Sequence, residues 1–260
     1  MKTTHNKLLL GAALLASLCT GHAQDAGQDW EFSATLPFWA AGLDGDVSVG
    51  GATQNVDIGF SDLAEKLDAS ASVALGARKG ALGLFGSIGY LKFAADGDLP
   101  GGGSTQAESE FTVADLAASY VVYMSDSDRP LVLEVLGGAR YIGLTNSIEI
   151  RNGAGNVLFS RENTHDLIDP IIGFRGTKGL TDKLHLDFAA DVGGFDLSEN
   201  QSELHWSAIT LLAYDFNDWF TLSGGYKVLA VDASNDKTGL RELGVDAKLS
   251  GAIIAATFKF

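Results

Sequence analysis

From residue 30 to the C-terminus, apolar side chains recur at every second position in one segment after another. In the last segment, residues 251–260, one face is wholly apolar, and the one charge, Lys259, lies on the other face. Successive side chains of a β-strand point to opposite faces, so each such segment predicts a strand with one apolar and one more polar row. Such a strand suits a wall between lipid and a polar interior.

Composition narrows the fold class. Of all residues 46% are hydrophobic, while the net charge is −15. This combination is not typical of disorder, and the acidity argues against nucleic acid as a partner. Beyond the N-terminal region no apolar run reaches the roughly 20 residues of a membrane helix. Apolar strands with acidic loops satisfy both observations. The sequence therefore predicts an all-β fold, a transmembrane antiparallel up-and-down β-barrel with short turns at one end and longer loops at the other.

The N-terminus predicts a secretory signal peptide over residues 1–23. A short basic start precedes an uncharged apolar run, residues 8–18, and the small residues Gly21 and Ala23 suit cleavage before Gln24. We expect a single barrel domain over residues 24–260. The one cysteine, Cys19, lies in the signal, so the mature chain has no disulfide. Lipid attachment to Cys19 is the alternative, although the preceding Leu18 is larger than that reaction favours.

Alternating segments and turn residues predict about ten strands, with eight as the alternative. The tight turns near residues 79, 126, 181 and 217 fall on the same side as both ends of the barrel. Pro37 is awkward in a strand, because it cannot donate to a ladder. The connection 43–68 is expected to hold a hairpin, 45–49 with 54–58, and one or two helical turns over 60–67. The expected strands are 30–42, 69–79, 81–95, 108–123, 131–146, 166–177, 183–197, 204–215, 219–231 and 249–260; the segments 96–106 and 147–165 are expected to be loops, the second with an optional protruding hairpin.

Two further patterns suggest a narrow, curved wall. Glycine pairs in mid-strand, such as Gly137-Gly138 and Gly224-Gly225, would relieve bending of a tightly coiled sheet. Aromatic residues gather near strand ends, as in interfacial girdles. The expected girdle residues are Trp30, Trp39, Tyr123, Trp206, Trp219, Phe258 and Phe260.

Five blocks, residues 39–46, 137–141, 169–175, 191–195 and 224–227, resemble those of a group of uncharacterised bacterial outer-membrane β-barrel proteins of about this length. The chain departs from the pattern at Lys227, where arginine is expected, and at Ala252, where proline is expected. The terminal Phe260 resembles the end of such barrels and implies delivery to the barrel-assembly machinery. The resemblance implies residence in the bacterial outer membrane, in contact with its lipid and lipopolysaccharide. It implies no activity and leaves the oligomeric state open.

The inward rows carry acids and bases in nearly equal number, although the chain as a whole is acidic. Buried charges are costly unless paired, and a barrel of eight to ten strands can be filled by side chains. We expect cross-barrel ion pairs, with a selective pore lining as the alternative. His185 and Lys259 lie on the same rows. The predicted lumen charge network is Glu31, Arg78, Asp115, Glu134, Arg140, Asp169, Arg175, Asp187, Asp191 and Lys227.

The predicted function is a narrow or plugged barrel with a role in small-solute transport or in envelope structure. No enzymatic activity, cofactor or metal is expected. A rim enzyme is the first alternative. A protease would place Asp44 and Asp46 opposite His165-Asp166 or His205, and a lipid A hydrolase would use His205 with Ser207. Adhesion through residues 44–67 is the second.

Overall fold

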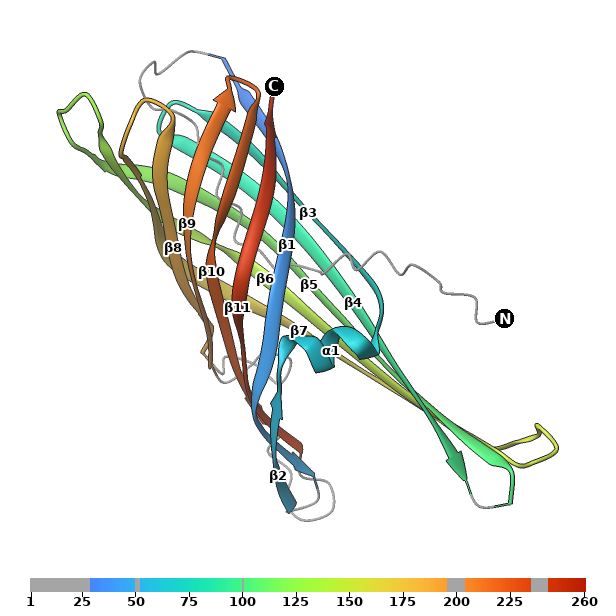
Figure 1. Ribbon diagram of the computed structural model, residues 1–260. Coiled ribbons are helices and arrows are strands. Elements are labelled where there is room, and N and C mark those ends of the chain that lie inside the picture. The colour runs from blue at the N-terminus through green and yellow to red at the C-terminus, as the bar shows by residue number, and fades with distance from the viewer. Residues whose placement is uncertain (1–28, 50–51, 100, 196–203, 235–242) are drawn as a thin grey trace, which may run out of the picture.

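A closed, ten-stranded antiparallel barrel forms the body of the molecule (Figure 1). The computed structural model describes residues 29–49, 52–99, 101–195, 204–234 and 243–260, so the expected signal peptide lies outside the described part. Each strand pairs with its neighbours in chain order, and β11 pairs back onto β1. The prediction of ten strands rather than eight is confirmed. The barrel strands are β1 (Glu31–Val49), β3 (Leu67–Lys79), β4 (Leu82–Leu99), β5 (Gly103–Met124), β6 (Leu131–Arg151), β7 (Val157–Gly179), β8 (Leu184–Gly194), β9 (Leu204–Asn217), β10 (Phe220–Ser234) and β11 (Leu243–Lys259).

The eleventh strand, β2 (Ala52–Ile58), belongs to the connection between β1 and β3. It pairs with the outer part of β1, from Leu43 opposite Ile58 to Val49 opposite Ala52, so the expected hairpin is present. The first strand of this hairpin is the last part of β1, which extends to Val49. The expected helical turns form α1 (Phe60–Lys66).

The two ends of the barrel differ. At the turn end, short connections join β3 to β4, β5 to β6, β7 to β8 and β9 to β10. The first residue of β1 and the last residue of β11 also lie at this end. Backbone hydrogen bonds in both directions between Phe32 and Phe260 close the barrel at this end. At the loop end lie β2, α1 and the long hairpins β4–β5 and β6–β7 (Figure 1). This matches the layout predicted from the tight turns.

The two segments expected to be loops, 96–106 and 147–165, are instead largely strand. Pairing continues to Leu99 opposite Gly103 and to Arg151 opposite Val157, with the second hairpin formed where it was expected. These extensions project beyond the barrel body (Figure 1). Both rows of side chains there are rich in polar residues, so the apolar alternation that marks a strand of the barrel wall is missing. Backbone pairing needs no such alternation.

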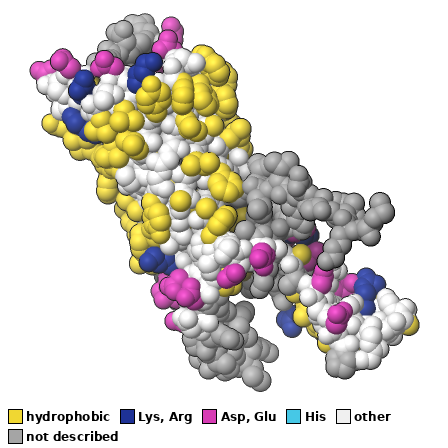
Figure 2. Space-filling model, viewed as in Figure 1, with side chains coloured by type: hydrophobic (Ala, Val, Ile, Leu, Met, Phe, Trp, Pro, Cys, Tyr) yellow, Lys and Arg dark blue, Asp and Glu magenta, His cyan; other side chains and the backbone are white. Residues whose placement is uncertain are grey.

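Side chains alternate between a lipid-like outer surface and the lumen, as the parity of the sequence predicts. Leu116 and Ile254 point outward and are 72% and 57% exposed, and Figure 2 shows an apolar band over the barrel body with charged side chains gathered toward its ends. Trp39 does not belong to the aromatic girdle. It lies on the inward row and is 3% exposed, because its odd position in β1 points it into the lumen.

Close packing of neighbouring strands explains one glycine in each of two pairs. A Cβ atom on Gly138 would collide with the backbone of Leu116 and Ala117, and one on Gly225 would collide with the backbone of Thr210. Both glycines therefore allow a neighbouring strand to approach closely. A larger residue at either site would push the wall apart.

Candidate functional site: the charged lumen

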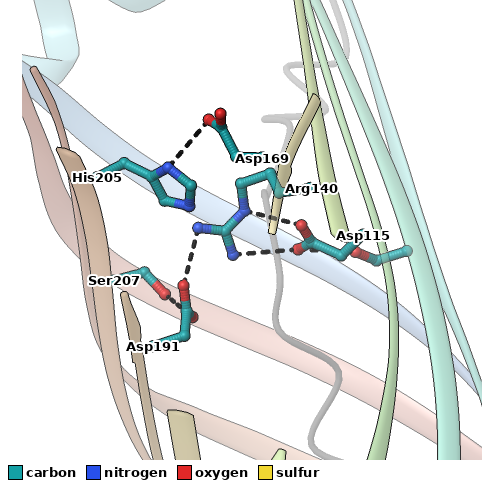
Figure 3. Close-up of polar contacts among 7 residues, drawn as sticks. Asp115, Arg140, Asp169, Asp191, His205 and Ser207 are labelled. Atoms are coloured by element: carbon teal, nitrogen blue, oxygen red, sulfur yellow. Dashed lines mark hydrogen bonds and ion pairs between the residues drawn. The ribbon is translucent and has the colours of Figure 1, made fainter. Parts of the chain in front are cut away.

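The lumen holds a cluster of charged and polar side chains from five consecutive strands, β5 to β9, shown in Figure 3. We call it the central cluster. All of its members point inward and are buried. Its members are Asp115, Arg140, Asp169, Asp191, His205 and Ser207.

Arg140 is the hub of the central cluster. Its Nε donates to Asp115 Oδ1 at 2.8 Å, and its Nη1 donates to Asp191 Oδ1 at 2.9 Å (Figure 3). Asp115 is its direct neighbour on β5, whereas Asp191 lies on β8, beyond β7. Ser207 donates to the second oxygen of Asp191. Both carboxylates are thus engaged by donors, as a buried ion pair requires.

A second contact in the central cluster joins β9 to β7. His205 Nδ1 lies 3.1 Å from Asp169 Oδ2, and both side chains are fully buried. Asp169 is the residue of β7 that lies opposite Arg140 in the register, yet its carboxylate turns to His205 (Figure 3). The Arg140–Asp191 contact and the His205–Asp169 contact therefore each join strands separated by one strand, and each crosses part of the lumen.

Toward the turn end, Glu134 gathers a second cluster. It accepts from Arg78 Nη2 at 2.5 Å and from the Ser119 hydroxyl at 2.6 Å, and Arg175 Nε lies 3.5 Å away. The guanidinium of Arg175 also lies over the ring of Phe85, 5.6 Å from its centroid. Arg78 on β3 and Glu134 on β6 are separated by two strands, so this contact also crosses the lumen.

A third cluster lies on β8, β9 and β11. His185 lies 3.3 Å from Asp187 and 3.3 Å from Asp215, and Lys259 Nζ lies 2.9 Å from Asp215. Thr221 donates to Asp215, and Thr177 donates to Asp187. The hydroxyls supply further donors to the buried carboxylates.

Two residues of the predicted network differ from the rest. Glu31 is exposed at the start of β1 and forms no ion pair among the described residues, because Arg78, its register partner, turns to Glu134. Lys227 is inward and 2% exposed, but no carboxylate of the described residues lies within ion-pair distance of it. Its Nζ instead lies 5.1 Å from the ring centroid of Trp39. The structure brings the other eight members into the three clusters.

Comparisons with known proteins were made on sequence and on structure. No family model matches the chain, and no curated protein matches it in sequence. Among solved structures, the outer membrane protease OmpT from Escherichia coli is similar with a TM-score of 0.58 and 9% identity, over 92% of this chain and all of that one. The chain has the outer-membrane β-barrel fold. Two further neighbours are Ail of Yersinia pestis (TM-score 0.38, 9% identity, 89% of this chain, 99% of that) and the NalP translocator domain of Neisseria meningitidis (TM-score 0.38, 14% identity, 90% and 89%).

At 9% identity the likeness of this outer-membrane β-barrel to OmpT concerns the fold alone, so its own residues decide the chemistry. Asp44 and Asp46 are exposed on β1, and Asp166 accepts a hydrogen bond from Tyr141 at 2.6 Å. His205 is next to the loop-end start of β9, but its side chain is fully buried in the central cluster. The side chain of His165 lies outside the described part of the structure.

The His-Ser pair of a hydrolase is also not formed in the barrel. Ser207 donates to Asp191, and His205 contacts Asp169. Among the described residues, no group of three or more histidine, cysteine or acidic side chains is arranged to hold a metal ion. In the same part of the chain, no helix is long and apolar enough to cross a membrane.

The predicted network of ten residues omits six buried members of the clusters: Ser119, His185, His205, Ser207, Asp215 and Thr221. Their inward parity could be read from the sequence. However, the middle of the inward row of β9 is apolar, with Ile209, Leu211 and Ala213, so polarity alone does not mark that row as lumenal. The partners of each charge depend on strand stagger, which the sequence pattern does not supply.

Proposed function

We propose that this protein is an outer-membrane barrel with a closed lumen, which serves the structure of the envelope rather than free diffusion of solutes. The apolar outward band supports its residence in a membrane, because only a closed barrel lets strands satisfy all their backbone groups in lipid. The short turns would face the periplasm and the long hairpins the exterior, as is usual for such barrels.

The observation that carries closure is the set of ion pairs across the lumen. Arg140 to Asp191, His205 to Asp169 and Arg78 to Glu134 each join strands that are not neighbours. Their side chains are buried, so they occupy the narrow interior rather than line a wide channel. An interior of this width can be filled by side chains.

Single-channel recording in a planar bilayer tests closure. The refolded chain is first shown to be folded by its altered gel migration on heating, and an open diffusion porin serves as a positive control. We expect no stable conductance steps, and no swelling of proteoliposomes in a small uncharged sugar. Stable steps whose size changes in Arg140→Ala or Arg175→Ala would overturn the proposal. They would establish these residues as the lining of a narrow channel for small solutes.

A further inference from the structure

Among the described residues, the shortest strand pairing in the barrel wall is the seam between β1 and β3. These strands pair only from Glu31 opposite Arg78 to Thr35 opposite Ala74. Pairing of β1 with β2 begins at Leu43. Between these two stretches, residues 36–42 of β1 pair with β11 alone. Both edges of the seam, residues 31–49 and 67–79, lie within the described part of the chain.

Pro37 lies where the seam opens. The Ser72 hydroxyl on β3 donates to the Pro37 carbonyl at 3.1 Å, so this edge of Pro37 faces β3. Proline has no N–H to donate to β3, and the ladder ends at Thr35, two residues before Pro37. One step further along β3, the buried hydroxyl oxygen of Ser70 has no hydrogen-bond partner. The edge therefore keeps unused hydrogen-bonding capacity.

The seam lies in the part of the wall that faces lipid. Leu36 on β1 and Leu75 on β3 point outward beside it and are well exposed. Its loop end is bounded by the segment that leads into α1, because the backbone of Ile58 and Phe60 lies against Gly42. Unpaired backbone at membrane depth is costly unless it borders a cavity or is covered by protein. A break retained there therefore indicates a use.

On the lumen side, the seam adjoins apolar side chains. Trp39 and Ala41 of β1 and Ala74 of β3 belong to one buried apolar cluster that extends around the lumen. These side chains are packed and buried, so an alkyl chain that enters between β1 and β3 has to displace part of the cluster, where it would meet apolar side chains rather than the ion pairs. The other members of the cluster are Val113, Ile142, Ala189, Ile209, Leu211, Leu229 and Ile253, with Phe111, Leu167, Val231 and Leu249 packed against them.

Next to this apolar surface lies Lys227, which forms no ion pair with a carboxylate of the described residues. Its ammonium contacts the face of Trp39, which is itself held by a hydrogen bond from its Nε1 to the Gly251 carbonyl at 3.2 Å. The nearby carboxylates of Asp115 and Asp191 are engaged by Arg140 and by serine hydroxyls. A buried ammonium without a carboxylate partner is costly, and an anionic group from a ligand would remove that cost.

We propose that the seam between β1 and β3 admits a single-chain amphiphile with an anionic head group from the lipid, its head on Lys227 and its chain along the apolar cluster. The apolar side chains beside the seam would bind the alkyl chain of the amphiphile, and Lys227 would bind its anionic head group. Because the seam opens to lipid rather than along the barrel axis, this site does not depend on whether the lumen conducts ions.

Quenching of Trp39 fluorescence tests the site. The probe is stearate that carries a nitroxide near its carboxyl end, added to the full chain in phosphatidylcholine vesicles. The other three tryptophans, Trp30, Trp206 and Trp219, are replaced by phenylalanine. We expect saturable quenching, and about a tenfold higher half-saturating concentration in Lys227→Met, as for the loss of one ion pair. The uncharged methyl ester of the probe should give no saturable phase.

Controls separate the site from folding. Lys259→Met removes a lumenal lysine that is paired with Asp215, and Lys227→Arg keeps the charge, so both should bind the probe like the parent chain. Equal binding by Lys227→Met, or quenching that never saturates, would overturn the proposal. Neither result would contradict a closed lumen. Conversely, ion conductance by the parent chain would not alter the expected quenching.

The route has its own test. Pro37→Cys and Ser72→Cys are combined in a Cys19→Ser background and joined by a short bifunctional maleimide. We expect the joined protein to be quenched at least several-fold more slowly than the same protein before joining, because the joined strands narrow the entrance. Equal rates would show that the amphiphile does not pass between β1 and β3, and the proposal would fail.

Discussion

The wall formed by β5, β6 and β7 and the seam between β1 and β3 are opposite in character. The β5–β6 ladder runs from Ser104 opposite Arg151 to Met124 opposite Val132, whereas the β1–β3 ladder ends after Thr35. The long wall carries Arg140, which is paired with two carboxylates, whereas Lys227 beside the seam has no carboxylate partner among the residues that the structure describes. Backbone pairing and charge pairing are thus complete in one region and incomplete in the other. This coincidence suggests that the barrel is built rigid on one side and accessible on the other.

The largest effect should follow from breaking the charge pairing of the long wall. Arg140→Ala leaves Asp115 and Asp191 buried without their cation, which should cost about 3–5 kcal/mol in the free energy of unfolding. Urea unfolding in lipid vesicles measures it. Arg161→Ala is the control, because Arg161 is exposed on the projecting part of β7 and should stay within about 0.5 kcal/mol. Similar losses in both variants would show that the central cluster does not stabilise the wall.

A smaller loss should follow from crowding the backbone of the same wall. In Gly138→Ala the new methyl group meets the backbone of Leu116 and Ala117, so we expect a loss of about 1–3 kcal/mol. Gly137→Ala is a matched control, because the nearest atom to its Cβ would be the Ile171 carbonyl oxygen at 3.9 Å. Equal unfolding midpoints for the two variants would contradict the close approach of β5 and β6.

Completing the seam should have the opposite sign. Pro37→Val supplies an N–H on the edge that faces Ser72, and one added ladder bond would stabilise the barrel by about 0.5–1.5 kcal/mol. Hydrogen exchange of the peptide that covers residues 36–42 should slow, and quenching of Trp39 by the nitroxide stearate should weaken. Leu36→Val, which adds no N–H, is the control. Unchanged exchange in Pro37→Val would mean that proline is not what ends the ladder.

Much of the long wall can be predicted from sequence, because period-two alternation reports which row a residue occupies. It places Asp115, Arg140 and Asp191 inward and gives ten strands. It fails for the hairpin extensions at 96–106 and 147–165, where polar residues interrupt both rows and apolar residues such as Ile148 and Phe159 form no continuous row. Parity also does not say whether a residue lies at mid-barrel or at the end of a strand, which is why Glu31 was predicted in the lumen but is exposed.

The seam is harder to predict than the wall. Pro37 signals an interrupted ladder, but the proline alone does not tell which neighbour is lost. That depends on the stagger of β3 against β1, which is set by the long connection through β2 and α1. Likewise, Lys227 looks like one more member of a balanced network until the partners of Asp115 and Asp191 are known. Charge pairing is a property of three-dimensional register, whereas charge count is a property of sequence.

The smallest effect is expected for ion pairs that the long wall forms in water. Lys92 on β4 lies 2.9 Å from Glu108 and 3.4 Å from Glu110 on β5, near the loop end. These side chains are partly exposed, and such pairs gain little, because water and salt screen them and two long side chains must be held in place. Lys92→Ala should therefore leave the urea midpoint unchanged within error, at low and at high salt alike. A loss comparable to that of Arg140→Ala would mean that proximity of charges matters more than their burial, and that the pairing in the lumen is not what distinguishes the wall from the seam.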